Sequence, residues 1–329
     1  MRTQHGVILN SDRGMDSRDD ASVGSSDDFD RFPRVRIPVA DGSIMVRHAG
    51  RGPAVLLLHG YPETSLAWRR VAPALTGAFT VVAADLPGYG DSTIAGDAFD
   101  DGRISKRTMA RALVDAMKAL HFEEFALVGH DRGARVAYRL ALDHPRSVRA
   151  LAVLDVIPIL DMAERMTYEA ARLMGHWFWL AQPSTSPETL IGRDPDLYVR
   201  HIIDQWDGAG VVDSDALDDY VRCMRKPEVL RAIGAEYRAD LVDLEHDRAD
   251  RARGRRIPCP VLAIWAQGGL VERFGDPLAI WRTWSDHVEG GPLPGGHFLI
   301  EERPQQVAAS LASFLTQAIG SAATGDRSC

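Results

Sequence analysis

From residue 34 onward, short apolar runs alternate with amphipathic stretches along the chain. Unbroken runs such as residues 55–58 are typical of parallel strands that are covered on both faces, whereas the first two runs alternate between apolar and polar residues and predict an antiparallel edge. The runs that predict strands are residues 35–39, 44–48, 54–58, 80–84, 124–128, 150–154 and 260–265. Amphipathic segments bounded by turn or capping residues predict helices at residues 65–75, 105–120, 134–143 and 304–318.

This alternation of strands and helices predicts a doubly wound α/β sheet. The alternation stops between residues 158 and 240, where aromatic and charged residues occur at helical spacing. We interpret residues 158–240 as a helical cap inserted over the carboxyl edge of the sheet, where α/β folds bind ligands. Residues 30–157 and 241–320 then form the core. Residues 1–29 are rich in Asp, Ser, Gly and Arg and are expected to be a disordered leader, and residues 321–329 are expected to be a flexible tail.

Composition and charge narrow the possible partners. The 329 residues include 38 Lys and Arg against 46 Asp and Glu, a net charge of −8, which argues against binding to nucleic acid or to an anionic membrane surface. No apolar run approaches the roughly 18 residues needed to cross a bilayer. The three cysteines are widely spaced and odd in number, and no secretory signal is present at the N-terminus, so a reducing cytoplasm is the expected compartment.

A strand that runs into a helix through a tight turn carries the clearest chemical signal. Residues 125–134 read Phe-Ala-Leu-Val-Gly-His-Asp-Arg-Gly-Ala, so Asp131 lies between Gly129 and Gly133, at the position of the nucleophile in a nucleophile elbow. A carboxylate at this point attacks saturated carbon and leaves an alkyl ester on the enzyme, which water must then hydrolyse. We therefore expect Asp131 to be a catalytic nucleophile rather than only a helix cap.

Hydrolysis of such an ester needs a base and an acid that orients the base. His297, in Pro-Gly-Gly-His-Phe after the last expected strand, is the expected base. The orienting acid has two candidate positions, each at the end of a predicted strand. Asp155 directly follows the strand at residues 150–154, whereas glycine occupies the expected place after the strand at residues 260–265. We therefore prefer Asp155 and keep Glu272 as the second candidate.

Two arginines lie beside the expected nucleophile. Arg132 and Arg135 are three residues apart at the start of a helix, where each cation opposes the helix dipole by about 0.3–1 kcal/mol. A pair of guanidinium groups in this unfavourable position predicts a binding site for a substrate carboxylate. The alternative is that one or both of them pair with acidic side chains of the protein itself. The backbone amides of Tyr61, in the sequence His-Gly-Tyr-Pro after an apolar run, and of Arg132 are expected to form an oxyanion hole.

With these residues assembled, the chain resembles the α/β-hydrolase superfamily, and within it the fluoroacetate dehalogenase group, over about residues 32–315. The motifs that carry the resemblance are Gly-His-Asp-Arg-Gly-Ala-Arg-Val-Ala at residues 129–137, Leu-Asp at 154–155 and His-Trp at 176–177. The resemblance implies an α/β-hydrolase fold with a mostly parallel eight-stranded sheet and an inserted helical cap. It also implies a homodimer that hydrolyses short 2-haloacids of the fluoroacetate and chloroacetate type to 2-hydroxy acids and halide.

The resemblance further assigns residues of the cap. His176, Trp177 and a cap tyrosine, here Tyr237, would hydrogen-bond the departing halide, while the two elbow arginines would hold the carboxylate of the haloacid. Three donors suit an anion, because hydrogen bonds to a charged group contribute about 1.5–3 kcal/mol each. Trp206 is expected to line the same pocket.

Other functions use parts of the same machinery. An epoxide hydrolase shares the Asp nucleophile and the His base, and it opens its ring with cap tyrosines. The tyrosines available for that role are Tyr168, Tyr198, Tyr220 and Tyr237. A haloalkane dehalogenase usually has Asn after His-Gly and Trp after the nucleophile, where this chain has Tyr61 and Arg132. A ligand-binding module without activity usually lacks the nucleophile or the histidine. The sequence contains no phosphate loop, nucleotide fingerprint or metal cluster, so we expect a small-molecule substrate and no cofactor.

Overall fold

One sheet runs through the structure and positions the other elements. The computed structural model describes residues 26–325 apart from 96–103, 184, 207 and 209. In these residues nine strands form the sheet in the order β1-β2-β4-β3-β6-β7-β8-β9, with β5 paired to β2. The strands are β1 (Arg34–Val39), β2 (Gly42–Gly50), β3 (Ala54–Leu58), β4 (Thr80–Ala84), β5 (Thr93–Ile94), β6 (Phe125–His130), β7 (Val148–Leu154), β8 (Val261–Ala266) and β9 (Val288–Leu293). β2 is antiparallel to β1, β4 and β5, and the remaining pairs are parallel.

The parallel part of the sheet is built from the unbroken apolar runs of the sequence. All five residues of β3 are buried, and Leu57 lies in register with Ala83 of β4 and Val128 of β6. Full burial of a leucine side chain stabilises a fold by about 1.5–3 kcal/mol. The expected mostly parallel, eight-stranded sheet is confirmed, and the short β5 is an addition to it.

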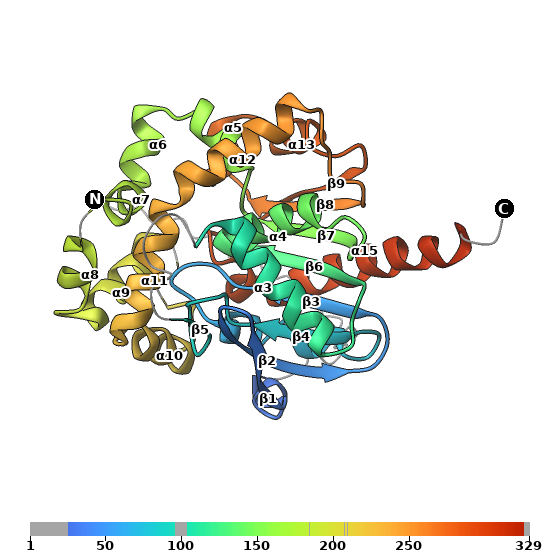
Figure 1. Ribbon diagram of the computed structural model, residues 1–329, viewed down its shortest axis with the longest axis horizontal. Helices are drawn as coiled ribbons and strands as arrows, with labels where there is room; N and C mark the ends of the chain where they lie inside the picture. The colour runs from blue at the N-terminus through green and yellow to red at the C-terminus, as the bar shows by residue number, and fades with distance from the viewer. Residues whose placement is uncertain (1–25, 96–103, 184, 207, 209, 326–329) are drawn as a thin grey trace, which may run out of the picture.

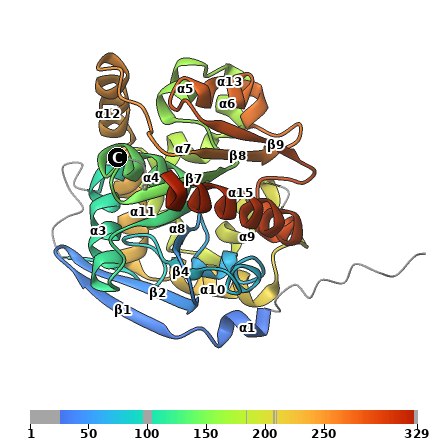
Figure 2. The same cartoon turned by 90° about the vertical axis from the view of Figure 1, so that its right-hand side faces the viewer.

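Helices cover both faces of this sheet (Figure 2). α3 (Lys106–Ala119) and α4 (Asp131–Asp143) pack together on one face, and α2 (Ala72–Leu75) and α15 (Pro304–Gly325) pack together on the other. α3 begins after Ser105, whose hydroxyl accepts the amide proton of Thr108 as a helix cap. The remaining core elements are short: α1 (Ser26–Asp30), the 3-10 helices η1 (Ser65–Trp68) and η2 (Val271–Phe274), α13 (Pro277–Arg282) and α14 (Leu299–Glu302).

The chain between β7 and β8 is helical. Its helices are α5 (Ile159–Glu164), α6 (Tyr168–Leu173), α7 (Gly175–Leu180), α8 (Ser186–Ile191), α9 (Pro195–Gln205), α10 (Ser214–Met224), α11 (Pro227–Arg238) and α12 (Asp240–Ala252). Figure 1 shows α6 to α11 gathered on the left, beside the sheet, whereas α12 runs from them back across the core. Tyr138 of α4 donates a hydrogen bond of 2.9 Å to Asp247 of α12, and Thr64 of the core donates one of 2.8 Å to Asp219 of α10. We therefore interpret α6 to α11 as the cap and α12 as its anchor on the core.

Both ends of the chain differ from expectation. The leader predicted over residues 1–29 is wrong for residues 26–29, which belong to α1, because Phe29 is fully buried against Phe32 and beneath Arg47. Residues 1–25 lie outside the described residues. The tail predicted over 321–329 is helical through Gly325 as part of α15, and residues 326–329 lie outside the described residues. Within the described part of the chain, no helix combines the length and the apolar character needed to span a bilayer.

Candidate active site

The turn between β6 and α4 is tight enough to require glycine on both sides of Asp131. Asp131 has a φ of +45°, in the left-handed region that costs a non-glycine residue energy and is common at functional sites. A Cβ on Gly129 would lie 2.5 Å from the Cα of Ala134, and a Cβ on Gly133 would lie 2.4 Å from the carbonyl oxygen of His59. The backbone thus has the geometry of a nucleophile elbow, which presents the Asp131 side chain above the end of the sheet.

The two oxygens of Asp131 have different surroundings. Oδ1 accepts a hydrogen bond of 3.0 Å from the backbone amide of Tyr61, one of the two amides expected in the oxyanion hole. A matching contact from the Arg132 amide remains a prediction. Oδ2 lies 3.8 Å from Nε2 of His297, which is too long for a hydrogen bond. Burial alone would raise the pKa of Asp131, but the neighbouring His297, His130 and Arg132 side chains outweigh burial and hold this pKa well below its usual range. Asp131 is therefore an ionised carboxylate with Oδ2 free to react.

His297 is oriented by Asp155. Nδ1 of His297 lies 2.6 Å from Oδ2 of Asp155, and the other carboxylate oxygen accepts the backbone amide of Ala266 at 3.0 Å. Asp155 directly follows β7 and has a φ of +50°, so a second strained residue stands at the carboxyl edge of the sheet.

Glu272, the other candidate acid, has different partners. It accepts Nε1 of Trp265 at 2.7 Å and the amide of Gly268 at 3.0 Å. The structure brings Asp131, Asp155 and His297 together, and it holds Glu272 on a neighbouring turn.

A second buried pair, which the sequence does not predict, lies next to these three residues and contacts the backbone of His297. Nδ1 of His130 lies 2.9 Å from Oε2 of Glu63, and Nε2 of His130 lies 2.8 Å from the carbonyl oxygen of His297. The same Glu63 oxygen accepts the amide of Gly60 at 2.8 Å. Burial works to lower the pKa of His130, but the Glu63 carboxylate outweighs it and raises the pKa to about 9. In the sequence, this pair is marked only by its neighbours: His130 precedes Asp131, and Glu63 follows the His-Gly-Tyr-Pro motif.

Glu301 is buried near Glu63 and contacts the cap. Its carboxyl group accepts the Tyr220 hydroxyl of α10, and its other oxygen lies 3.8 Å from Nη2 of Arg69. Burial, with the nearby negative charge of Glu63 in addition, raises the pKa of Glu301 to about 8. Glu301 is therefore expected to be a neutral acid at pH 7.

Replacing Glu301 with Gln should stabilise the fold at alkaline pH. The folded-state pKa of about 8 lies above the ordinary value of 4.5, so the stability that the neutral form contributes is complete below about pH 4.5 and is lost as the pH rises through 8. Glutamine is neutral at every pH. The variant's free energy of unfolding should therefore exceed that of the wild type by about 1–3 kcal/mol at pH 9 and by little at pH 5.

Urea unfolding at the two pH values would measure this difference. Glu289→Gln is a suitable control, because Glu289 is an exposed residue of β9. An equal effect of Glu301→Gln at both pH values would contradict the conclusion that Glu301 is neutral at pH 7.

Aromatic side chains of the cap close over the elbow. The ring of His176, from α7, stacks on Tyr61 with centroids 6.0 Å apart and an interplanar angle of 10°. Trp206, at the end of α9, lies between His176 at 5.8 Å and His297 at 5.5 Å. These residues, with Asp131, line a cavity of about 50 Å³. Because one water needs roughly 10–15 Å³ of such cavity volume, a cavity of this size matches a ligand of a few non-hydrogen atoms.

Several polar atoms around this cavity are buried without a hydrogen-bond partner in the described residues. They are Nδ1 of His176, Nε1 of Trp206, Oη of Tyr237, and Nε and Nη1 of Arg135. Burial lowers the pKa of His176 to about 4, so its imidazole is neutral at pH 7 and carries one N–H. Buried polar groups without partners are costly and therefore point to a polar ligand that they bind.

Trp177 and Tyr237 complete the group expected to bind halide. Trp177 lines the cavity. Tyr237 lies just behind the lining, with its ring edge-to-face against Tyr61 at 5.5 Å, His176 at 6.3 Å and Trp177 at 6.1 Å.

The guanidinium groups of the two elbow arginines have different surroundings. Arg135 lines the cavity, and among the described residues its guanidinium group has only the sulfur of Met162 as a hydrogen-bond acceptor, at 3.3 Å. Arg132 is not among the lining residues, and its guanidinium group is bound by Glu236 and Asp240. The structure therefore leaves Arg135 available to an anionic ligand and gives Arg132 two carboxylates of the protein itself.

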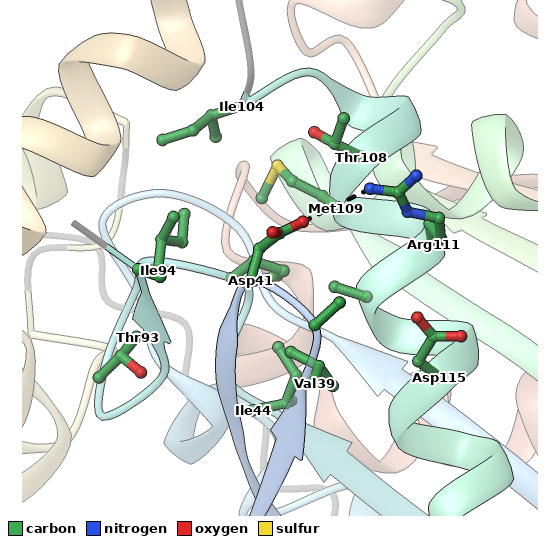
Figure 3. A pocket seen from close by; sticks show the side chains of 14 residues that line it. Val39, Asp41, Ile44, Thr93, Ile94, Ile104, Thr108, Met109, Arg111 and Asp115 are labelled. Atoms are coloured by element: carbon green, nitrogen blue, oxygen red, sulfur yellow. Dashed lines mark hydrogen bonds and ion pairs between the residues drawn. The ribbon is translucent and has the colours of Figure 1, made fainter. Parts of the chain in front are cut away.

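A larger cavity of about 270 Å³ lies elsewhere, between the β1–β2 hairpin, β5 and α3 (Figure 3). Apolar side chains such as Ile44, Ile94 and Met109 line it, and Asp41 and Arg111 face one another across it at 3.4 Å. Its lining residues include neither a strained elbow nor a pair of nucleophile and base. The small cavity at the elbow is therefore the candidate active site.

Comparisons with known proteins agree with this geometry. Residues 53–304 match the model of the α/β hydrolase fold family. A fluoroacetate dehalogenase from Burkholderia sp is 40% identical over 293 residues, which cover 88% of this chain and 96% of the relative. A soluble epoxide hydrolase from Corynebacterium sp. (strain C12) is 32% identical and covers 81% and 91% of the two chains. The crystal structure of an α/β hydrolase from Nostoc sp PCC 7120 has a TM-score of 0.83 and 43% identity, with 88% and 99% coverage.

The chain belongs to the α/β hydrolase family, and it is a hydrolase. Within that family it is similar along nearly the whole length of fluoroacetate dehalogenase, which confirms the group expected from the elbow and cap motifs. The similarity to a soluble epoxide hydrolase shows that the same scaffold and much of the same sequence also occur in a protein with another named activity.

Proposed function

We propose that this protein is a hydrolytic dehalogenase of short 2-haloacids of the fluoroacetate and chloroacetate type. One observation carries the proposal: the buried guanidinium group of Arg135, without a carboxylate partner in the described residues, faces a cavity of about 50 Å³ that also contains Asp131. A small anion with a carboxylate and a saturated carbon matches both features. The 40% identity to a fluoroacetate dehalogenase supports the same substrate class.

The first chemical step is an attack by Oδ2 of Asp131 on the carbon that bears the halogen. A carbon–oxygen bond forms, the carbon–halogen bond breaks, and the halide leaves with the bonding electron pair. His176, Trp177 and Tyr237 receive the halide, while Arg135 holds the substrate carboxylate. This step leaves the 2-position of the acid esterified to Asp131.

The second step hydrolyses this ester. His297, held by Asp155, takes a proton from water, and the resulting hydroxide attacks Cγ of Asp131. The negative charge that develops on Oδ1 is stabilised by the Tyr61 amide, which already lies 3.0 Å away. The bond from Cγ to Oδ2 then breaks, and the departing 2-hydroxy acid takes a proton from His297. The carboxyl group of Asp131, which now includes the water oxygen, releases the second proton of that water and becomes a carboxylate again.

Epoxide hydrolysis is the alternative, and the 32% identity to a soluble epoxide hydrolase favours it. It needs a cap tyrosine that can protonate the epoxide oxygen. Tyr220 donates to Glu301, and Tyr168 is 78% exposed on α6. Tyr198 accepts the Tyr61 hydroxyl and keeps its own proton, so Tyr198 and Tyr237 are left for this role. A neutral epoxide would also leave Arg135 buried and unpaired, which argues for the haloacid.

Product release from four substrates would test the proposal. Wild-type enzyme should release halide from fluoroacetate or chloroacetate, but act poorly on chloroacetamide and on an aryl epoxide. Arg135→Leu should raise KM for the acids by about 10²-fold, because a bidentate charge-assisted contact is lost. Equal turnover of chloroacetate and its amide would overturn the carboxylate site. Faster turnover of the epoxide than of either acid would establish the alternative.

We also propose that the protein is a homodimer that acts in the cytoplasm. In the described residues, every large apolar side chain that is exposed belongs to α6, α7, α8, α9 or α12. The proposal rests on this restriction of exposed apolar side chains to helices between β7 and β8, since large exposed apolar patches mark protein interfaces. Cys223 and Cys259 are buried free thiols, as expected of a chain that folds in a reducing compartment. Light scattering in solution would measure the oligomeric state.

A further inference from the structure

Tyr61 connects the core to the cap beside the elbow. Its backbone amide donates to Asp131 at 3.0 Å, and its side chain is buried. Its hydroxyl donates a hydrogen bond of 2.9 Å to the hydroxyl of Tyr198 on α9. The Tyr198 ring in turn lies 5.7 Å from the ring of Trp179 on α7, the helix that carries His176. One hydrogen bond therefore joins the loop of the oxyanion amide to two helices of the cap.

Tyr198 shares one face of α9 with two residues of the cavity wall. Ile202 follows Tyr198 by four residues and Trp206, at the end of the helix, follows it by eight, and side chains at these spacings lie on one side of a helix. Both Ile202 and Trp206 line the cavity at the elbow. A shift of α9 away from Tyr61 would break the hydrogen bond between the two tyrosines and would move both wall residues.

Five of the lining side chains form a closed ring that begins and ends at Tyr61. His176 lies 6.0 Å from Tyr61 and 5.8 Å from Trp206, measured between ring centres. His297 lies 5.5 Å from Trp206, and its Nε2 is 3.8 Å from Oδ2 of Asp131, which completes the ring. The cavity that they line has a volume of about 50 Å³. Because one water needs roughly 10–15 Å³ of such volume, one extra methyl group on a ligand requires a wider ring.

We propose that Tyr61 and Tyr198 are a positioning pair that sets the substrate range of the enzyme. Their hydrogen bond holds α9 where the cavity accepts an unsubstituted 2-haloacetate and discriminates against acids with a further carbon on the reacting carbon. This inference rests on the proposed dehalogenase function and narrows its substrate class. Apolar pockets discriminate against one additional methylene group by about 10- to 200-fold, so a small movement of the wall changes the substrate range.

A comparison of chloroacetate with 2-chloropropionate, which has one more methyl group on the reacting carbon, tests the pair. Tyr61→Phe and Tyr198→Phe each remove one hydroxyl and keep the ring. In either variant, the ratio of kcat/KM for chloroacetate to kcat/KM for 2-chloropropionate should fall by about tenfold, because α9 is no longer held. The methyl group also slows attack on carbon chemically, but that effect is the same in wild type and variant and cancels in the comparison.

A double variant and a matched control define the route of the effect. If one hydrogen bond carries it, the combination of Tyr61→Phe and Tyr198→Phe should have the same ratio as either single variant. Tyr220→Phe is the matched control, because it removes another hydroxyl contact between cap and core, the one to Glu301. Among the described residues of α10, none lines the cavity at the elbow. The control should therefore lower the melting temperature and leave the ratio at its wild-type value.

Two kinetic outcomes would overturn the inference. An equal loss of kcat/KM with both acids would reduce the hydrogen bond between Tyr61 and Tyr198 to a structural contact. A change of the ratio in Tyr220→Phe as large as that in Tyr198→Phe would show that any loosening of the cap has the same effect.

Binding of the two product acids, glycolate and lactate, keeps this inference apart from the proposed function. They differ by the same methyl group, and the fluorescence of Trp177 and Trp206, which line the cavity, would follow their binding. Wild type should prefer glycolate, and Tyr61→Phe and Tyr198→Phe should each reduce that preference by about tenfold. If wild type releases halide from neither haloacid, the proposed function fails, while this titration still decides the role of the pair. An unchanged preference in both variants would overturn the inference, and a wild type that binds neither acid would overturn both proposals.

Discussion

Replacing His297 with Asn should stop the reaction after one halide has been released and leave Asp131 as a covalent ester. The first step uses only Oδ2 of Asp131 and the halide donors, whereas the second needs a base to activate water. His297 lies close enough to serve, with Nε2 at 3.8 Å from Oδ2 of Asp131. Loss of general-base catalysis typically slows a step by about 10²–10⁴-fold, which is enough for the ester to accumulate.

Intact-protein mass spectrometry after exposure to chloroacetate would show this ester as a single adduct on the variant. Asp131→Asn in the same assay is the matched control and should carry no adduct. In a kinetic assay, the His297→Asn variant should release one equivalent of halide in a burst and almost none afterwards. Continued halide release at the wild-type rate from an unmodified protein would rule out the covalent scheme.

Replacing Asp155 with Asn should lower kcat by about 10⁴-fold with little effect on KM, by analogy with the amide substitution of a triad acid. The carboxylate accepts Nδ1–H of His297 at 2.6 Å, and this contact sets the tautomer in which Nε2 can accept a proton. An amide at the same place can turn its NH₂ group toward Nδ1 and favour the wrong tautomer. The alkylation step should be nearly unaffected, so the variant should also accumulate ester.

Glu272→Gln is the control that separates the two candidate acids. Glu272 accepts hydrogen bonds from Trp265 and Gly268, away from His297, so this substitution should leave kcat within about threefold of wild type. Steady-state kinetics of both variants on chloroacetate, with thermal unfolding to verify the fold, would decide between them. A large loss with Glu272→Gln and a small loss with Asp155→Asn would reverse the assignment.

The elements that could be predicted from the sequence are those whose signal is local. An unbroken apolar run of five residues predicts β3, and glycines on both sides of Asp131 predict the elbow, because backbone sterics act over a few neighbouring residues. β9 was missed for the same reason. Its sequence, Val-Glu-Gly-Gly-Pro-Leu, has no apolar run, and it forms a strand because β8 offers a parallel edge for it to pair with.

Local patterns and motifs are enough to predict the α/β hydrolase fold and the residue types that meet at the carboxyl edge of the sheet. Which of those residues are free to act depends on how distant segments pack together. Arg132 and Arg135 are equivalent by spacing, yet Glu236 and Asp240, more than a hundred residues away along the chain, bind the first and leave the second facing the cavity. Charge pairing, burial and cavity volume depend on contacts between distant segments, and spacing along one helix contains no information about them.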